Sequence, residues 1–182
     1  MPRIYGKKVM LREYMKEDLT HMREWVNDEE ITRDLSDIFL YPNTLNDTES
    51  YLNNILEGKD SNRAHFVIAH KSDGSYIGQI DLIRVDWKNR TAEMGIVIGK
   101  KDCLGKGYGS EAIKLMQKFV FEKMNLNRLE LCVHEHNERA KACYKKCGFV
   151  EEGIKRDCIY KDGKYTDVIF MGILKKEHEG LK

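Results

Sequence analysis

The sequence is poor in proline and has no long apolar run. Its two prolines, Pro2 and Pro42, leave no proline-rich linker to divide the 182 residues. No stretch approaches the roughly 18 uncharged apolar residues of a membrane-spanning helix, and residues 1–12 lack the apolar core of a secretory signal. We therefore expect one domain over residues 1–182, located in the cytoplasm and without a membrane partner.

The sequence also lacks a paired cysteine motif. Its five cysteines are scattered, and no CxxC occurs. Cys143 and Cys147 would share a helix face, but no His or Cys pair completes a zinc set. We expect reduced thiols and no metal site.

A third quantity in short supply is net charge. The 31 basic and 30 acidic residues leave only +1, but residues 13–60 carry −9 and the remainder carries +10. An acidic segment favours cations, and a basic one favours anions such as phosphates. No dense basic run with interleaved aromatics occurs, so nucleic acid is not an expected partner.

The hydrophobic pattern changes along the chain. Apolar residues at helical spacing predict a helix over 16–27 and a second helix after Thr44, which is a plausible N-cap with Asp47 three residues later. Strand-forming segments follow, and then helices and strands alternate. This order predicts an α+β, or mixed α/β, domain. The expected strands are 9–12, 64–71, 76–85, 91–98, 128–133, 149–160 and 165–174, and the later helices are 108–124 and 137–147.

Glycines are concentrated in one region: five fall within residues 95–109. Gly105, Gly107 and Gly109 lie between a predicted strand and the helix that begins at Tyr108. Glycine lets backbone N–H groups surround an anion, and a helix N-terminus adds its positive dipole. The segment therefore predicts a phosphate cradle, and the alternative is a flexible loop with a solvated Lys106.

Two common phosphate motifs do not fit this loop. It lacks the GxxxxGK[ST] pattern of a P-loop. Residues 107–112 match GxGxxA, but Ile98 and Gly107 are nine residues apart and the preceding strands form an antiparallel meander. A dinucleotide-binding fold is therefore not expected.

Two sequence blocks instead resemble motifs of the GNAT superfamily of acyl-CoA-dependent N-acetyltransferases. Residues 104–109 (LGKGYG) are similar to its Q/R-x-x-G-x-G/A pyrophosphate motif, with Leu104 in place of Gln or Arg. About 30 residues later, Asn137 to Ala140, Tyr144 and Gly148-Phe149 resemble its N-x-x-S/A…Y-x-x-x-G-F segment. The resemblance covers nearly the whole chain. It implies a mostly antiparallel central sheet with a splayed parallel pair and flanking helices, and acetyl-CoA as cosubstrate.

Three further segments, Leu11-Arg12, residues 25–28 and residues 160–168, are similar to ribosomal-protein N-terminal acetyltransferases and to spermidine or diamine acetyltransferases. This resemblance implies acetyl transfer to a primary amine. Two acceptors stay open: a small cationic amine such as a polyamine, or a peptide N-terminus. A third alternative is a non-catalytic acyl-CoA-binding module. Relatives of this kind are often dimers, so a homodimer is also an open alternative.

The chemistry of acetyl transfer suggests roles for a few side chains. A phenol with a pKa near 10 can donate to a developing thiolate, and Tyr144 stands where the family has its general acid. Glu93 is the candidate base, directly or through water, because relatives often place a carboxylate on this strand. Lesser base candidates are Asp81, His134 and His136.

The resemblance also implies a cofactor-binding set and leaves a place for the acceptor. The backbone of Ile96, Val97 and Ile98 would bind the pantetheine arm. The other cofactor-binding candidates are Leu104, Gly105, Lys106, Gly107, Tyr108, Gly109, Ser110, Asn137, Ala140 and Lys141, with Lys145 as a further phosphate ligand. An acidic cluster after the first helix would pair with ammonium groups of the acceptor: Asp28, Glu29, Glu30 and Asp34, with Asp37 nearby.

Overall fold

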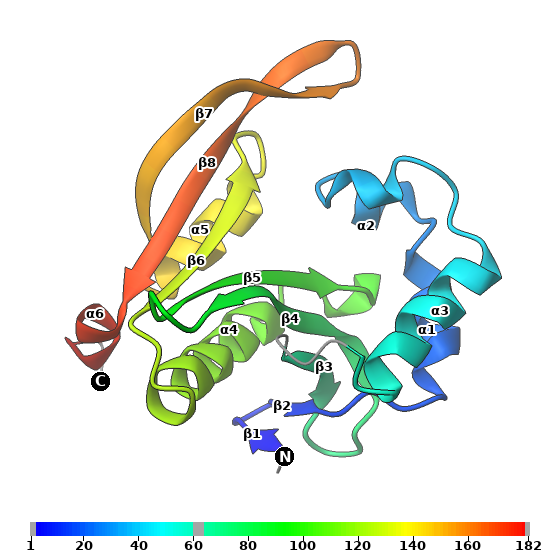
Figure 1. Cartoon of the computed structure of the whole chain (residues 1–182). Coiled ribbons are helices and arrows are strands. Elements are labelled where there is room, and N and C mark those ends of the chain that lie inside the picture. The colour runs from blue at the N-terminus through cyan, green and yellow to red at the C-terminus, as the bar shows by residue number, and fades with distance from the viewer. Residues whose placement is uncertain (1–2, 60–63, 181–182) are drawn as a thin grey trace.

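The computed structural model describes residues 3–59 and 64–180, and its centre is one twisted sheet of eight strands in the order β1-β2-β3-β4-β5-β6-β8-β7 (Figure 1). Met1, Pro2 and Asp60, on which the expectations about the N-terminus and the acidic segment partly rest, lie outside the described residues. The strands are β1 (Ile4–Tyr5), β2 (Val9–Arg12), β3 (His65–His70), β4 (Tyr76–Asp86), β5 (Thr91–Ile98), β6 (Arg128–His134), β7 (Val150–Lys161) and β8 (Lys164–Leu174).

Helices cover both faces of this sheet. They are α1 (Asp18–Trp25), α2 (Glu29–Thr32), α3 (Leu45–Leu56), α4 (Tyr108–Lys118), α5 (Glu138–Lys146) and α6 (Lys175–Gly180). Short 3-10 turns occupy Asp37–Phe39 and Lys101–Cys103. The mixed α/β class with a mostly antiparallel sheet is confirmed.

The sheet opens at its only parallel pair among the described strands, β5 and β6. Their pairing is limited to Thr91 with Arg128, Ala92 with Leu129, and Glu93 with Glu130. Beyond these pairs β6 diverges, while β5 stays paired with β4 as far as Ile98 (Figure 1). The expected splayed pair is therefore present, and it leaves one edge of β5 without a strand neighbour.

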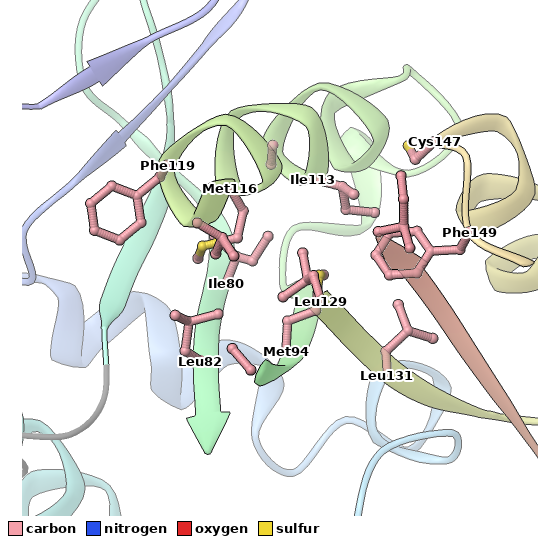
Figure 2. Packing of buried hydrophobic residues seen from close by; sticks show 14 of the residues in the cluster. Ile80, Leu82, Met94, Ile113, Met116, Phe119, Leu129, Leu131, Cys147 and Phe149 are labelled. Atoms are coloured by element: carbon pink, nitrogen blue, oxygen red, sulfur yellow. The ribbon is translucent and has the colours of Figure 1, made fainter. Parts of the chain in front are cut away.

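Two apolar clusters form on the opposite faces because side chains alternate along each strand. On β3, Phe66 and Ile68 join the larger cluster under α4, while Val67 and Ala69 join the cluster under α1 and α3. Figure 2 shows Ile113 and Met116 of α4 pointing onto the sheet. Other labelled members of this larger cluster are Ile80, Leu82, Met94, Phe119, Leu129, Leu131, Cys147 and Phe149.

A buried ion pair fixes the start of α1. Arg12 and Asp18 are 3% and 1% exposed, and two guanidinium N–H groups donate to the Asp18 carboxylate at 2.9 and 2.7 Å. Asp18 also accepts from the backbone N–H of Met15 at 2.8 Å. This bidentate contact ties β2 to the helix that carries Met22 and Trp25 into the smaller cluster.

The helix expected over 108–124 does not stay α-helical, so this prediction was wrong in its last part. The α-helical part ends at Lys118, and Phe119–Lys123 form a π-helical turn. The Met124 N–H donates to the Phe119 carbonyl at 3.0 Å, an i→i+5 bond. Phe119, Val120 and Phe121 are all buried, and the wider turn lets three consecutive apolar side chains face the interior.

Several features bear on the other expectations. All five cysteines are free thiols. Within residues 3–59 and 64–180, no group of three or more His, Cys, Asp or Glu side chains is placed to hold a metal ion. In the same part of the chain, no helix combines the length and apolar character needed to cross a bilayer.

Candidate active site

The first of two clefts lies where β5 and β6 diverge. We call it the splay cleft; it measures about 390 Å³ and is bounded by β5, β6, the glycine loop, α4 and α5. It brings together most of the residues that the sequence predicts for the cofactor and the acid: Ile96, Val97, Ile98, Leu104, Gly105, Gly107, Tyr108, Gly109, Ser110, Asn137, Ala140 and Tyr144.

The predicted lysines do not line this cleft. Lys106 is exposed on the glycine loop. Lys141 donates to Glu138 at 2.6 Å, and Lys145 lies 2.8 Å from Glu151. Two basic residues that the sequence interpretation did not select, Arg139 and Lys146, do line it.

The glycine loop presents backbone donors to the splay cleft. Gly105 and Gly107 have φ values of 72° and 84°, a region that L side chains rarely adopt. Gly107 is the N-cap of α4, and no side chain caps the helix, so its first N–H groups are left for a ligand. Together with the helix dipole, these donors suit an anion such as a pyrophosphate.

The rest of the splay cleft suits an extended amide-bearing chain. From Gly95 to Ile98, β5 has no strand partner on the side that faces β6, so its backbone groups can pair with a ligand strand. Asn137 accepts from the Ala140 N–H at 3.0 Å through Oδ1. Its Nδ2 group has no partner among the described residues and is left to donate. The cleft therefore fits the pantetheine and pyrophosphate parts of coenzyme A.

Tyr144 lies on α5, one turn after Ala140, and lines the splay cleft. Its ring packs edge-on against Phe149 at a centroid distance of 6.0 Å. Burial raises the pKa of Tyr144 above its ordinary value, so the phenol stays protonated at neutral pH. In the part of the chain that the structure describes, no side chain or backbone group hydrogen-bonds its hydroxyl, which leaves the proton available.

Glu93 lies on β5, two residues before Gly95, and lines neither cleft. Its Oε2 atom is 3.6 Å from Arg84 Nη2, and its side chain is 30% exposed. The structure thus places this carboxylate in a surface ion pair upstream of the cleft.

The second cleft lies under α1 and α3, and we call it the α1–α3 cleft. It measures about 310 Å³, and its walls are largely apolar, with Met22, Trp25, Phe39 and Ile83 among them. Leu35, Ile96 and Val97 line both clefts. The two clefts therefore meet over the end of β5.

A chain of hydrogen-bonded polar groups forms one wall of the α1–α3 cleft. Asp81 Oδ1 is 3.1 Å from His65 Nδ1, and Asp81 Oδ2 accepts from the Tyr51 hydroxyl at 3.4 Å. Gln79 Nε2 donates to the Tyr51 hydroxyl at 3.5 Å, and the Tyr76 hydroxyl donates to Gln79 Oε1 at 3.4 Å. Burial raises the pKa of Asp81, and the hydrogen bond from His65 opposes that shift.

His134 and His136 lie beside the splay cleft rather than in it. Their rings are 5.4 Å apart, and burial lowers the pKa of His134. His136 Nε2 is 2.8 Å from Asp34 Oδ1, so the loop after β6 contacts the segment after α2.

The predicted acidic wall is largely paired with cations. Asp28 caps α2 by accepting from the Glu30 N–H at 3.0 Å. Lys101 Nζ lies 2.8 Å from the Asp28 carboxylate and 2.8 Å from the Glu30 carboxylate. Glu30 and Asp34 line the splay cleft, whereas Asp28 and Glu29 line neither cleft. Asp37 is exposed on its 3-10 turn. The carboxylates in the α1–α3 cleft are Asp47 and Asp81.

The sequence interpretation missed Tyr51 and His65 as site residues. Tyr51 belongs to the apolar stripe of the helix after Thr44, where only its hydroxyl distinguishes it from a packing residue. His65 begins a strand of buried apolar residues, and a histidine there is the one local signal of a polar partner.

Comparison with known proteins agrees with this geometry. A family model described as an acetyltransferase (GNAT) domain matches residues 8–150. A putative ribosomal N-acetyltransferase of Bacillus subtilis (strain 168) is 39% identical over 110 residues, so the match spans 60% of each chain. A spermidine N(1)-acetyltransferase of Vibrio cholerae is 32% identical over 119 residues, 65% of this chain and 68% of that protein.

Among solved structures, the spermidine N-acetyltransferase of Vibrio cholerae in complex with CoA and spermine has a TM-score of 0.83 at 26% identity, covering 96% of this chain and 99% of that one. The family model covers most of the chain, and the strand order, the splay and the glycine loop all fit it. The protein belongs to the GNAT acetyltransferase family, whose members use acetyl-CoA as the acetyl donor.

Proposed function

We propose that the protein transfers an acetyl group from acetyl-CoA to the primary amine of a small cationic molecule such as a polyamine, with Tyr144 as general acid. One observation carries the proposal: two clefts of different character meet over Ile96 and Val97. One has a backbone loop suited to phosphate at its end, and the other has the partly buried Asp81 carboxylate. A donor and a cationic acceptor entering from opposite sides would meet at β5.

The splay cleft would hold the donor. The N–H groups at the start of α4 and of the glycine loop face the pyrophosphate, and the free edge of β5 pairs with the pantetheine arm. Asn137 Nδ2 donates to an amide carbonyl of that arm. Lys106, Lys141 and Lys145, with Arg139 and Lys146, would neutralise the outer phosphates. Bound acetyl-CoA supplies the thioester whose acetyl group is transferred.

The α1–α3 cleft would hold the acceptor. Its apolar walls suit an aliphatic stem, and Asp81 and Asp47 suit ammonium groups. The acidic cluster of Asp28, Glu29, Glu30 and Asp34 would attract a polycation toward the clefts. The Vibrio cholerae relative, solved with CoA and spermine, supports a small polycationic acceptor.

The proposed transfer needs a neutral amine, because an ammonium has no lone pair. The amine nitrogen bonds to the thioester carbonyl carbon as the carbon–sulfur bond breaks, and Tyr144 gives its proton to the departing sulfur. The raised pKa of Tyr144 keeps that proton in place until the thiolate, a stronger base than the thioester, develops. The attacking nitrogen then loses a proton to the Tyr144 phenolate, which restores the phenol.

The direct test measures free thiol released from acetyl-CoA in the presence of polyamines, single amino acids or N-terminal peptides. We expect thiol release and an acetylated product with at least one polyamine, identified by mass spectrometry. If no thiol is released with any of these acceptors, the proposal is contradicted.

Replacing Tyr144 by Phe tests its role separately. The ring and its contact with Phe149 are kept, so acetyl-CoA affinity should change little, while kcat should fall about 100-fold, at the lower end of general acid catalysis. Calorimetry of CoA binding and steady-state kinetics measure the two quantities. Full activity in the Phe variant would remove Tyr144 as the acid.

A peptide N-terminus is the second candidate acceptor. Ile38, Leu40 and Tyr41, in and beside the 3-10 turn at the α1–α3 cleft, are 71%, 72% and 75% exposed. An exposed apolar rim suits contact with peptide residues that follow the acetylated one. The 39% identical relative is named as a putative ribosomal N-acetyltransferase. Higher kcat/KM for peptides than for polyamines would favour this acceptor.

A further inference from the structure

Asp81 is a partly buried carboxylate, with 15% of its side chain exposed, on the acceptor side of β5, and the proposed transfer gives it no proton-handling role. It lies on β4 directly opposite Gly95 of β5 in the antiparallel register. Gln79, two residues earlier, pairs with Val97. Because side chains alternate, Gln79 and Asp81 face the α1–α3 cleft, while Ile80 and Leu82 face the cluster under α4.

The absence of a Gly95 side chain matters at this position. A Cβ built on Gly95 would lie 2.9 Å from Ile83 Cδ1, another residue of the cleft wall. A side chain here would have to displace Ile83, so glycine preserves the shape of that wall. Asp81 lines the same cleft as Ile96 and Val97, and these two residues line both clefts.

The groups around Asp81 come from four parts of the chain. His65 of β3 and Tyr51 of α3 hydrogen-bond its two oxygens. Tyr14, after β2, and Tyr76 of β4 are buried phenols that interact with it electrostatically. Among the described residues, His65 is its only ion-pair partner. No Lys or Arg side chain of those residues competes with an ammonium for this carboxylate.

We propose that Asp81 is the base that takes the first proton from the acceptor ammonium, and that His65 is a positioning residue that holds its carboxylate. The inference rests on the proposed acetyl transfer. Burial raises the pKa of Asp81, which makes its carboxylate a stronger base than an exposed aspartate. The apolar walls of the cleft weaken the hydration of the ammonium and so favour its neutral form.

The proton balance closes with the two groups acting in turn. Asp81 takes one proton from R–NH3⁺ and leaves R–NH2. The nitrogen bonds to the carbonyl carbon, the carbon–sulfur bond breaks, and the sulfur takes the Tyr144 proton. The nitrogen then loses its second proton to Tyr144, and Asp81 releases the first one to solvent when the amide leaves. The sum is one amide, one thiol and one released H⁺.

The competing base is Glu93. It lies on the same β5 face as Gly95 and Val97 by alternation, but two residues upstream is about 7 Å along the strand, and Arg84 lies 3.6 Å from its carboxylate. The structure thus separates the two carboxylates by location: Asp81 lines the acceptor cleft, and Glu93 does not.

Three carboxylate-to-amide variants test the inference: Asp81→Asn, Glu93→Gln and the control Asp86→Asn. Asp86 is on the same strand as Asp81 but caps the β4–β5 turn through Asn89 and lies outside both clefts. For Asp81→Asn we expect kcat at pH 7 to fall about 100-fold or more, with an unchanged KM for acetyl-CoA. The loss should shrink as pH rises toward about 10, where an alkyl amine deprotonates by itself.

The pH profile separates a base from a structural role. A purely structural effect would lower kcat by the same factor at every pH, and that result would overturn the inference. Wild-type kcat in Asp81→Asn, or the pH-dependent loss appearing in Glu93→Gln instead, would overturn it as well. Wild-type protein that acetylates no amine or peptide at all refutes the proposed transfer itself, so the two failures are distinct.

A second measurement does not depend on turnover. Carbon-13 NMR of uniformly labelled wild-type protein, with each carboxyl resonance assigned through bonds from the backbone, follows the Asp81 carboxyl as pH changes in the presence of CoA. We expect it to titrate above the ordinary aspartate range and to shift downward when spermidine is added, because an ammonium favours the carboxylate. If Asp81→Asn fails to fold, this wild-type titration decides. An ordinary titration, unmoved by spermidine, would refute the role.

Discussion

Replacing Asp18 by Ala should destabilise the protein more than any loss of a surface ion pair. Asp18 is 1% exposed and holds a guanidinium that is 3% exposed through bonds of 2.7 and 2.9 Å. Its removal leaves the Arg12 charge buried without a counterion, which costs about 3–5 kcal/mol. For a chain of this size, about 3 °C in Tm accompanies each kcal/mol, so the midpoint should fall by about 12 °C.

A second variant separates the pair from the shape of the site. In Arg12→Met with Asp18→Leu, no charge is left buried, and replacement of a buried pair by apolar residues is often neutral. The Arg12 guanidinium also donates to the carbonyls of Gly74 and Glu13 at 3.1 and 2.9 Å. Loss of those bonds costs about 1–2 kcal/mol, so the double variant should be more stable than Asp18→Ala alone.

Urea unfolding followed by circular dichroism measures the stability of each chain, and the single variants Arg12→Met and Asp18→Leu complete the double-mutant cycle. A loss below about 1 kcal/mol for Asp18→Ala would refute the reasoning, because surface ion pairs already reach that value. A double variant that loses the sum of the two single losses would refute it too, because the two groups would then be uncoupled.

Three further predictions concern the site. Gly107→Ala should lower the free energy of unfolding by about 1–2 kcal/mol, because φ is 84° there, and it should weaken CoA binding measured by calorimetry. The control is Gly153→Ala, because Gly153 is an open position on β7 without positive φ. Burial raises the Asp81 pKa, so its ionisation weakens the fold as pH rises above about 4; Asp81→Asn should gain Tm over wild type between pH 4 and 7, and a pH-independent difference would contradict this. The side chains of Cys147 and Ser110 lower the pKa of Cys143, whose sulfur lies 3.2 Å from Ser110 Oγ, so iodoacetamide should label Cys143 first, and CoA should slow that labelling in a peptide mass map.

Local patterns in the sequence were enough for some elements. Thr44 and Asp47 form a capping box in which the Asp47 N–H donates to Thr44 Oγ1 at 3.2 Å and the Thr44 N–H donates to Asp47 at 2.8 Å. All its atoms lie within four residues, so the sequence alone predicts it. The glycine loop is similar, because a positive φ and a helix start are both local properties.

The acceptor side depends on contacts that the sequence does not reveal. Asp81 meets the end of β5 through its register with Gly95, and it meets His65 across a β3–β4 ladder that contains an irregularity between Ile68 and Ala69. One residue of slip would turn Asp81 to the other face. From the strand pattern alone, Asp81 is therefore only one of several candidate carboxylates.

The net charge of the acidic segment likewise does not show which of its carboxylates form ion pairs. The acidic segment suggested a free anionic wall, but Lys101 contacts Asp28 and Glu30, and His136 contacts Asp34. These partners lie about seventy to a hundred residues away in the chain. Net charge describes the electrostatic field far from the surface, whereas the folded structure determines which carboxylates remain unpaired.

The short β5–β6 pairing divides the sheet into two groups of strands, β1 to β5 and β6 to β8. Within the sheet, three residue pairs ending at Glu93 and Glu130 join the two groups, and the apolar cluster under α4 packs against both. Ile98 lies five residues beyond that joint, about 16 Å along the strand, so a rotation of about 5° moves it by about 1.4 Å. At this distance from the joint, a small change in strand twist near Ala92 displaces the residues at the junction of both clefts by enough to make or break a hydrogen bond. Substitutions that never touch a ligand can therefore alter donor and acceptor binding together.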